Sequence, residues 1–534
     1  MMSPHDFTAR LVGEVPSTSA KRWGRRPAIL FRGSRWSHEA LARRVERVRA
    51  LLSGAGCGRG DRVAIAMENC PEYIVAYFAV TATGAALVPI NTFLAVPEIS
   101  DTLRDARAAI LITSPGWLES HPGVLEGNDD LNRIVLRGGR EGDGGIQSGG
   151  RRVIFMDDEA SPASSEPCES SDPAVIIYTS GTTGLPKGVV LTHDNLLGNA
   201  RGCLEVVGAT ERDRILVALP LFHSFTQMVG ILAPVLTGMS IALCEKLDRT
   251  EVRAGLMRLR PTIFPAVPAV FNAMAAVRPG PIARWLNPVR VYISGGAPLP
   301  VETLERFERA YRRPLCEGYG LSEASPVVSL NPPRGTRKAG SVGPPLPGVE
   351  VRIVDPEGND VPHDVAGEIL VRGPGVMRGY LDRGDETRSV LRDGWLRTGD
   401  QGRRDEDGYI FIMGRSKEML IFRGMNIYPR EIESVLESHP AVREAAVIGS
   451  PDPARGDVPW AFVTLSGTLE GGEQALRRLC IDRLARYKVP RGIVILDDMP
   501  RNTTGKILKK DLQGRVIPRE AASPRARAAR ARQH

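Results

Sequence analysis

The fold is decided by residues 174–193, which read Ala-Val-Ile-Ile-Tyr-Thr-Ser-Gly-Thr-Thr-Gly-Leu-Pro-Lys-Gly-Val-Val-Leu-Thr-His. Residues 174–178 are apolar and rich in β-branched side chains, and residues 189–191 repeat the pattern, so each run predicts a buried strand. The residues between them supply hydroxyls, glycines and Lys187. Glycines let backbone N–H groups approach an anion, while hydroxyls and an ammonium add donors and charge. This combination favours a phosphate-binding loop over an ordinary Gly/Ser hairpin. It is not a G-x-x-x-x-G-K-[ST] loop, because that pattern is absent from the chain.

Length and composition limit the number of domains and the class of protein. A chain of 534 residues is too long for one ordinary core and predicts at least two domains. The seven cysteines are scattered without a C-x-x-C pair, which argues against a disulfide scaffold or a zinc site and favours a cytoplasmic location. Residues 1–10 lack the apolar segment of a signal peptide. The most apolar stretch, Tyr73–Ile90, is interrupted by Gly84 and is interpreted as core rather than as a membrane span.

The net charge of +8 is unevenly placed along the chain. Residues 523–534 hold four arginines and no acid, so residues 512–534 are interpreted as a basic, disordered tail. A solvated tail is the expected state, with weak contact to an acidic lipid surface as the alternative. The charge on the rest of the chain is unremarkable, and no nucleic acid is expected as a partner.

Residues 1–110 alternate between helix and strand patterns. Residues 36–39 predict a helix start, Arg62–Ala66 predicts a strand, and residues 71–83 predict a helix. Such alternation predicts parallel sheets covered by helices. The polar, Gly-rich residues 138–150 predict a surface loop. The apolar stripe expected on the first of these helices consists of Leu41, Val45, Val48, Leu51 and Leu52.

The second half of the chain contains further candidate segments. His223 stands among aromatic residues at a predicted strand end, where a packed core histidine is the simplest interpretation. The apolar run 228–236 fits a channel or a helix core equally well. Residues 291–299 run from a strand into small residues, which leave space for a flat ring or an acyl chain. Asp400 ends the segment 394–400, and its carboxylate suits two hydroxyl donors. Pro429 predicts a helix start, with Glu431 and Glu433 expected in its first turn.

Taken in order, these segments resemble the AMP-forming acyl-CoA synthetase (adenylate-forming) superfamily over about residues 10–511. The resemblance also rests on Glu-Gly-Tyr-Gly-Leu-Ser-Glu at 317–323 and on Gly-Arg-Ser-Lys-Glu at 414–418. It implies an α/β fold, in which parallel-rich sheets flanked by helices and a small β-barrel-like part form the N-terminal domain, and a small mobile α+β unit forms the C-terminal domain. The implied boundaries are 1–413, a hinge at 414–417 and 418–511, followed by the basic tail at 512–534.

The resemblance assigns roles to individual residues. Lys506, Lys187, Glu323 and His223 are the implied catalytic residues, Thr179 and Glu323 the Mg²⁺ ligands, and Lys417 the hinge. The channel for CoA and the acyl group is expected to include His223, Phe225, Gly296, Gly424 and Met425. The implied ATP and AMP contacts are Thr179, Ser180, Gly181, Thr182, Thr183, Gly184, Lys187, Gly295, Gly296, Ala297, Glu317, Gly318, Tyr319, Gly320, Ser322, Asp400, Arg415 and Lys506. Ser322 stands where the family usually has Thr, which keeps the hydroxyl but loses a methyl group.

The implied activity is ATP-dependent activation of a carboxylic acid to acyl-AMP, followed by transfer to CoA, with ATP, Mg²⁺ and CoA as the required small molecules. Residues 218–225 contain no Asp, and relatives that activate amino acids place a carboxylate there to pair a buried ammonium. The absence of an Asp indicates a carboxylic acid without an amino group. The resemblance is closest to fatty-acid–CoA ligases, through residues 219–225 and 325–328, and it implies a medium- or long-chain fatty acid, with a cinnamate-type aryl acid as the alternative. The chain has no insertion between Asp400 and Gly414, which favours CoA over an acyl-carrier protein as the acceptor. An inactive binding or scaffold relative is the remaining alternative, and a homodimer is left open.

Overall fold

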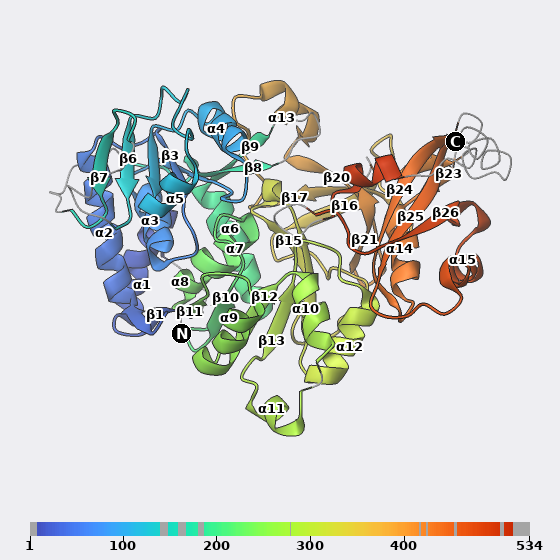
Figure 1. The fold of residues 1–534 in the computed structure, drawn as a ribbon. Coiled ribbons are helices and arrows are strands. Elements are labelled where there is room, and N and C mark those ends of the chain that lie inside the picture. The colour runs from blue at the N-terminus through green and yellow to red at the C-terminus, as the bar shows by residue number, and fades with distance from the viewer. Residues whose placement is uncertain are drawn as a thin grey trace, which may run out of the picture.

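The computed structural model describes residues 8–138, 148–158, 167–179, 186–277, 279–415, 418–422, 425–452, 456–501 and 507–515. Within these residues the strands form two eight-stranded sheets and two five-stranded sheets. Figure 1 shows the last sheet and its helices as an orange and red unit that stands beside the rest of the molecule.

The sheet that carries residues 174–193 is mainly parallel. Its strands are β3 (Arg62–Ala66), β4 (Ala86–Pro89), β5 (Ile110–Thr113), β6 (Arg133–Leu136), β7 (Arg152–Phe155), β8 (Pro173–Thr179), β9 (Lys187–Thr192) and β18 (Gly379–Tyr380). They follow the order β18-β9-β8-β4-β3-β5-β6-β7, with β9 antiparallel to both β8 and β18. The neighbours from β8 to β7 are parallel. The two strands expected on either side of the loop are thus β8 and β9.

The second eight-stranded sheet has a parallel centre and antiparallel ends. Its strands are β1 (Pro27–Phe31), β2 (Ser34–Ser37), β10 (Arg214–Val217), β11 (Ser240–Leu243), β12 (Ile263–Ala266), β13 (Val291–Ser294), β14 (Leu315–Gly320) and β15 (Val327–Leu330). They follow the order β15-β14-β13-β12-β10-β11-β1-β2. The carboxyl ends of β10, β12, β13 and β14 lie at one edge of this sheet, because these strands are parallel neighbours.

Helices cover and connect these two sheets. They are η1 (Val12–Glu14), α1 (Val15–Trp23), α2 (His38–Gly54), α3 (Pro71–Ala82), α4 (Val96–Asp105), α5 (Pro115–Ser120), α6 (His193–Val207), α7 (Ser224–Thr226), the π-helical η2 (Gln227–Leu232), α8 (Ala233–Thr237), α9 (Arg249–Ala254), the π-helical η3 (Gly255–Leu259), α10 (Pro268–Ala275), α11 (Pro281–Leu286), α12 (Val301–Tyr311) and η4 (Ser322–Ala324). Local chemistry sets their starts. The Ser37 hydroxyl accepts from the N–H of Ala40 at 3.1 Å to begin α2, and Thr192 and Asn195 cap α6 reciprocally.

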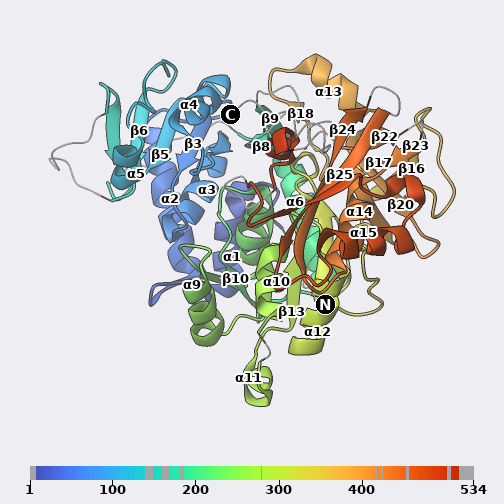
Figure 2. The same ribbon diagram turned by 45° about the vertical axis from the view of Figure 1, so that its right-hand side comes forward.

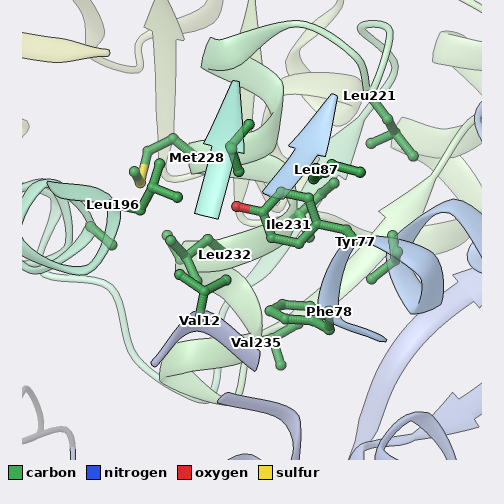
Figure 3. Close-up of a cluster of buried hydrophobic side chains, with 14 of the residues drawn as sticks. Val12, Tyr77, Phe78, Leu87, Leu196, Leu221, Met228, Ile231, Leu232 and Val235 are labelled. Carbon is green, nitrogen blue, oxygen red and sulfur yellow. The ribbon is translucent and has the colours of Figure 1, made fainter. Parts of the chain in front are cut away.

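A shared hydrophobic core joins the two sheets. Figure 3 shows Tyr77 and Phe78 of α3 packed near Ile231 and Leu232 of η2 and Leu87 of β4. The stripe expected on α2 is buried at all five positions. The apolar run 228–236 belongs mainly to this core, although Val229 is only partly buried and faces the cleft described below. Among the described residues, no helix has the length and apolar character needed to cross a membrane.

The third sheet is antiparallel and curled, and it is the small barrel-like part of the expected fold. Its strands are β16 (Glu350–Val354), β17 (Gly367–Arg372), β19 (Leu391–Arg392), β20 (Trp395–Arg404) and β21 (Ile410–Arg415), and α13 (Gly384–Val390) precedes β19. β20 lies at its centre and pairs with β17, β19 and β21. The β20–β21 hairpin carries two of the expected site residues.

The C-terminal unit is a separate α+β layer with its own core. Its elements are β22 (Leu420–Phe422), β23 (Met425–Ile427), α14 (Pro429–Glu437), β24 (Val442–Asp452), β25 (Gly456–Leu465), α15 (Gly472–Arg483), η5 (Arg486–Lys488), β26 (Gly492–Leu496) and η6 (Lys509–Arg515). Helix α14 packs against β24, and Ile432 and Leu436 of α14 are fully buried. The domain boundary at residue 413 stays a prediction, and the hinge residue Lys417 lies outside the described residues.

Two expectations about this unit were wrong in detail. Pro429 opens α14 and Glu431 lies in its first turn, but Glu433 lies just beyond that turn. Glu433 is buried because it accepts from the N–H of Val447 at 2.9 Å and pairs with Lys509 at 2.9 Å. The basic tail was expected to start at residue 512, yet residues 509–515 form η6. Leu512 is fully buried there, because its apolar side chain completes a cluster with β24 and β25.

Candidate active site

The loop expected to cradle phosphate joins β8 to β9. Thr179 at the end of β8 lies opposite Lys187 at the start of β9. Lys187 is mostly buried and forms an ion pair with Glu386 of α13, and its ammonium lies 5.5 Å from the centre of the Tyr380 ring. The lysine is therefore held by an anion and an aromatic face at the base of the loop. The remaining loop residues expected to bind phosphate lie outside the described part of the chain: Ser180, Gly181, Thr182, Thr183 and Gly184.

Tyr380 links Lys187 to Glu323. It belongs to β18, and its hydroxyl donates to Oε1 of Glu323 at 3.0 Å. Burial and the neighbouring Glu323 carboxylate raise the pKa of Tyr380, so the hydroxyl stays protonated. These four residues, Lys187, Glu386, Tyr380 and Glu323, are called the Lys187 cluster below. Sequence reasoning missed Tyr380 and Glu386, because no motif marks them and only the pairing of β18 with β9 brings them to the loop.

Three expected nucleotide contacts assemble beside the curled sheet. The Tyr319 hydroxyl donates to Oδ2 of Asp400 at 2.6 Å, and Nε of Arg415 lies 3.0 Å from Oδ1 of the same carboxylate. Asp400 and Arg415 face each other in register across β20 and β21. Asp400 is buried, and burial together with this carboxylate raises the pKa of Tyr319 well above its usual value. Tyr319, Asp400 and Arg415 are called the Asp400 cluster below.

Glycines and small residues bring the backbone close to this part of the site. A Cβ atom on Gly320 would lie 2.0 Å from the carbonyl oxygen of Pro326. A Cβ atom on Gly318 would lie 3.1 Å both from a backbone oxygen and from a side-chain carbon. Gly295 follows β13, where an added Cβ would lie 3.3 Å from the Phe225 ring, while Gly296 has a φ of +82°. Together with the exposed Ala297, these glycines form one wall of the cleft.

Glu317 is a buried carboxyl group on the same strand as Tyr319. Its Oε1 accepts from the backbone N–H of Leu299 at 2.8 Å. Burial raises its pKa to about 7, only partly offset by that hydrogen bond and by Arg430 of the C-terminal unit. One of its oxygens is thus committed to the protein backbone, and near neutral pH the group exists in both protonation states.

His223 and Ser322 both line the cleft, and Ser322 approaches Ser224, the residue after His223. His223 faces the cleft, and its Nδ1 accepts from the N–H of Phe225 at 3.3 Å. Desolvation by the surrounding protein lowers the pKa of His223. The hydroxyl of Ser322 lies 3.4 Å from that of Ser224. Because a serine hydroxyl both donates and accepts, residue 322 keeps the hydrogen-bonding group expected there.

One large cleft, of about 3220 Å³, contains both clusters and lies between the N-terminal sheets and the C-terminal unit. The C-terminal unit contributes Arg430 of α14, which lies 2.9 Å from Glu437 and 3.7 Å from Glu433 and also acts on Glu317 across the cleft. Met425 lies in β23, but its side chain is not among the described ones, and Gly424 and Lys506 lie outside the described residues.

The donor set of the cleft fits a magnesium nucleotide. Glu323 and the Thr179 hydroxyl are the hard oxygen ligands that Mg²⁺ prefers. Lys187 offers a cation for phosphate, and the Asp400 carboxylate offers acceptor oxygens for ribose hydroxyls. Near the loop between β8 and β9 the cleft is thus suited to polyphosphate. Near Asp400 and the glycine wall it is suited to a nucleoside.

The sequence matches a known family in two blocks. Residues 17–381 match the AMP-binding enzyme family, and residues 431–506 match the AMP-binding enzyme C-terminal domain.

Individual relatives match almost the whole chain. A feruloyl-CoA synthase from Amycolatopsis sp is 36% identical over 511 residues, which cover 94% of this chain and 99% of the relative. A long-chain-fatty-acid–CoA ligase from Bacillus subtilis is 32% identical, with 95% of each chain covered. The solved structure of o-succinylbenzoate coenzyme A synthetase from Bacillus subtilis, in complex with ATP and magnesium ion, superposes with a TM-score of 0.80. It is 30% identical, and the match covers 93% of this chain and 99% of that one.

Proposed function

The chain belongs to the AMP-binding enzyme family, and we propose that it joins a medium- or long-chain fatty acid to CoA through an acyl-adenylate. The coarser activity, an AMP-forming acid–CoA ligase that uses ATP, Mg²⁺ and CoA, follows from the family and from the relatives named above. The fatty-acid substrate and the residue roles that follow are the proposal.

The chemistry requires positive charge where two anions meet. A carboxylate oxygen of the acid attacks the α-phosphate of ATP, the bond to the β-phosphate oxygen breaks, and pyrophosphate leaves. The CoA thiol then attacks the acyl carbon, AMP leaves, and the thiol proton passes to solvent. Mg²⁺, when bound, would neutralise phosphate oxygens. In this scheme Glu323 and Thr179 hold it, and Lys187 contacts the phosphates.

The Lys187–Glu386 ion pair supports a specific role for that cluster. Lys187 is already desolvated and oriented by Tyr380 and Glu386, so little ordering is needed when a phosphate arrives. The incoming phosphate competes with the Glu386 carboxylate for the same ammonium. The Asp400 cluster differs, since Arg415 and Tyr319 both donate to its carboxylate and ribose hydroxyls would add further donors to it.

One observation carries the choice of an apolar acid. Beside His223, the wall of the cleft continues through Phe225, Val229, Val267, Val270 and Met274. Residues 218–230 contain no charged side chain, so no carboxylate from this segment is available to pair a substrate ammonium. An alkyl chain would lose water against this wall without leaving a polar group unpaired.

An aryl acid is the second candidate, favoured by the 36% identity to a feruloyl-CoA synthase. An aromatic ring would pack against Phe225, while a phenolic hydroxyl buried against valines would need a hydrogen-bond partner.

The test is a panel of acids that contains C8–C16 fatty acids, cinnamate and ferulate, assayed for pyrophosphate release with and without CoA. We expect the fatty acids to have the highest kcat/KM and CoA to accelerate turnover. A higher kcat/KM for cinnamate or ferulate would replace the fatty-acid proposal with the aryl one. Release that does not respond to CoA would point to an acyl-carrier protein as the acceptor.

A further inference from the structure

An exposed apolar tip projects from the second eight-stranded sheet. Helix α11 has no buried residue, and both views show it standing away from the sheets (Figure 1, Figure 2). The exposed fraction is 75% for Ile282, 82% for Trp285 and 49% for Leu286. Val277, two residues beyond the end of α10, and Met257 of η3 are also exposed, at 53% and 68%. Large apolar side chains that gather at one exposed place mark an interaction surface.

The tip lies in a strongly basic part of the chain. Residues 248–290 contain seven arginines and only two acids, Asp248 and Glu251. Both acids are used locally, because Asp248 caps α9 and Glu251 accepts from the N–H of Lys246. Within the described residues, five of these arginines take part in no ion pair with an acidic side chain: Arg249, Arg253, Arg258, Arg260 and Arg284. Four of them, Arg249, Arg253, Arg260 and Arg284, line the same cleft as Val277 and Leu286. An acidic partner therefore complements this face, whereas a second copy would bring like charges together.

The combination of tryptophan, aliphatic side chains and arginines fits a bilayer surface. Tryptophan prefers the boundary between headgroups and acyl chains, and arginine attracts anionic headgroups. A helix of two turns is too small for a standard protein interface, which needs about 800 Å² from each partner, but it suits shallow insertion among lipids.

The same face borders the cleft. Met257, Val277 and Leu286 line the same cleft as His223 and Gly295. We propose that α11 and the adjoining arginines dock on an anionic phospholipid bilayer, from which the enzyme takes its acyl substrate. This inference rests on the proposed fatty-acid function, because a long-chain acid partitions into membranes whereas a small hydrophilic acid does not.

The docking test uses the full-length protein without substrate. Sedimentation is measured with vesicles of neutral phosphatidylcholine alone and with vesicles that also contain about one third phosphatidylglycerol. We expect binding to the anionic vesicles that weakens with salt, together with a blue shift in tryptophan emission. The double variant Ile282→Ser/Trp285→Ser should raise the lipid concentration for half-maximal binding at least 10-fold and abolish the shift. Ile481→Ser is the matched control, since Ile481 of α15 is 53% exposed on the other unit, and it should bind as the unmodified protein does.

Three outcomes would overturn the docking proposal. They are a protein that stays in the supernatant with anionic vesicles, a double variant that binds as tightly as the unmodified chain, and loss of binding on deletion of residues 523–534 alone. A lipid-free dimer that dissociates in the double variant would make the tip a self-association surface and would also overturn it.

A turnover assay separates this proposal from the proposed function. With octanoate in solution, the double variant should keep its kcat/KM, because Ile282 and Trp285 lie outside the cleft lining. With palmitate supplied in anionic vesicles, its kcat/KM should fall about 10-fold. Equal turnover of vesicle palmitate by both proteins would overturn delivery from the bilayer. A preference for cinnamate in the acid panel would refute the fatty-acid substrate and leave the vesicle-binding result standing.

Discussion

The Asp400 cluster and the Lys187 cluster line the same cleft, but their charged groups are paired in different ways. In the Asp400 cluster, Arg415 and Tyr319 both hold one buried carboxylate, and that carboxylate keeps acceptor capacity for a ligand. In the Lys187 cluster, the cation expected to bind phosphate is paired with Glu386. In the proposed scheme a ribose adds donors to a carboxylate that is already held, whereas a phosphate competes with the Glu386 carboxylate for Lys187. The comparison teaches that a motif residue such as Lys187 can reach the cleft already paired with a group that no motif marks.

The largest expected effect concerns Lys506, which lies outside the described residues. The resemblance to the family implies that Lys506 is the cation that reaches the acid and the α-phosphate. Glu386 partly neutralises Lys187, so we expect the reaction to depend strongly on Lys506. Lys506→Ala should slow acyl-adenylate formation by about 10² or more, the magnitude of one preorganised donor. Pyrophosphate exchange measures this step.

The same variant should largely spare thioester formation from supplied acyl-AMP and CoA, if the C-terminal unit rotates between two orientations about Lys417. Gly424→Trp should show the reverse, with exchange retained and the CoA step blocked. Lys488→Ala is the control, because Lys488 is ion-paired with Glu431 in the same unit. Equal slowing of both half-reactions by Lys506→Ala would reject the two-orientation mechanism.

The second test removes the charge on which the Asp400 cluster depends. Asp400→Asn leaves Arg415 without its buried counter-ion and weakens the acceptor for ribose. The KM for ATP should rise about 10–100-fold, since a charge-assisted hydrogen bond and a partly buried pair are lost. Steady-state kinetics at varied ATP would measure it. Asp405→Asn is the matched control for Asp400→Asn. Asp405 lies in the turn of the same β20–β21 hairpin, pairs with Lys338 and does not line the cleft. An unchanged KM for ATP in Asp400→Asn would remove Asp400 from the nucleoside site.

The third test compares two buried carboxyl groups. Asp400 has a cation beside it, whereas Glu317 has one backbone N–H and a pKa raised to about 7 by burial. A raised pKa means that folding favours the protonated acid. The resulting stability is present below the unfolded pKa of about 4.3 and is lost as the pH rises through 7. Glu317→Gln should therefore match the unmodified protein at pH 4 and exceed its unfolding free energy by roughly 1–3 kcal/mol at pH 8.5. Urea unfolding at both pH values measures the difference. A constant difference would show that Glu317 does not titrate as the burial implies.

The smallest expected effect tests the competition at Lys187. Glu386→Gln removes the anion with which phosphate competes for Lys187, so the KM for ATP should fall about 3-fold while kcat changes little. The effect is small because the Lys187–Glu386 ion pair is partly exposed and worth under about 1 kcal/mol. Asp385→Asn is the control, because Asp385 is an almost fully exposed neighbour that pairs with Arg388. A rise in KM for Glu386→Gln would mean that Glu386 orients Lys187 and does not compete for it.

Much of the fold and part of the candidate site were predictable from sequence. The apolar runs on either side of residues 179–188 predicted β8 and β9, and the helix-start signal at residues 36–39 predicted α2 with its buried stripe. Tyr319, Asp400 and Arg415 were chosen from separate motifs, and Tyr319 and Arg415 both lie within hydrogen-bonding distance of Asp400. The place of Glu433 in α14 and the start of the tail were harder to predict from sequence. The first depends on the buried ion pair between Glu433 and Lys509, and the second on the burial of Leu512.

By itself, the sequence determined the alternation of strands and helices, the donor-rich loop and the motif residues, because these depend on periodicity and on the chemistry of neighbouring side chains. Only the tertiary structure decided that Glu386 and Tyr380 meet Lys187, since they are almost two hundred residues away and arrive through the pairing of β18 with β9. It also decided that Glu317 faces Arg430 across the cleft and that Trp285 stands exposed. Burial and long-range contact depend on how distant segments pack, and no local pattern in the chain records that.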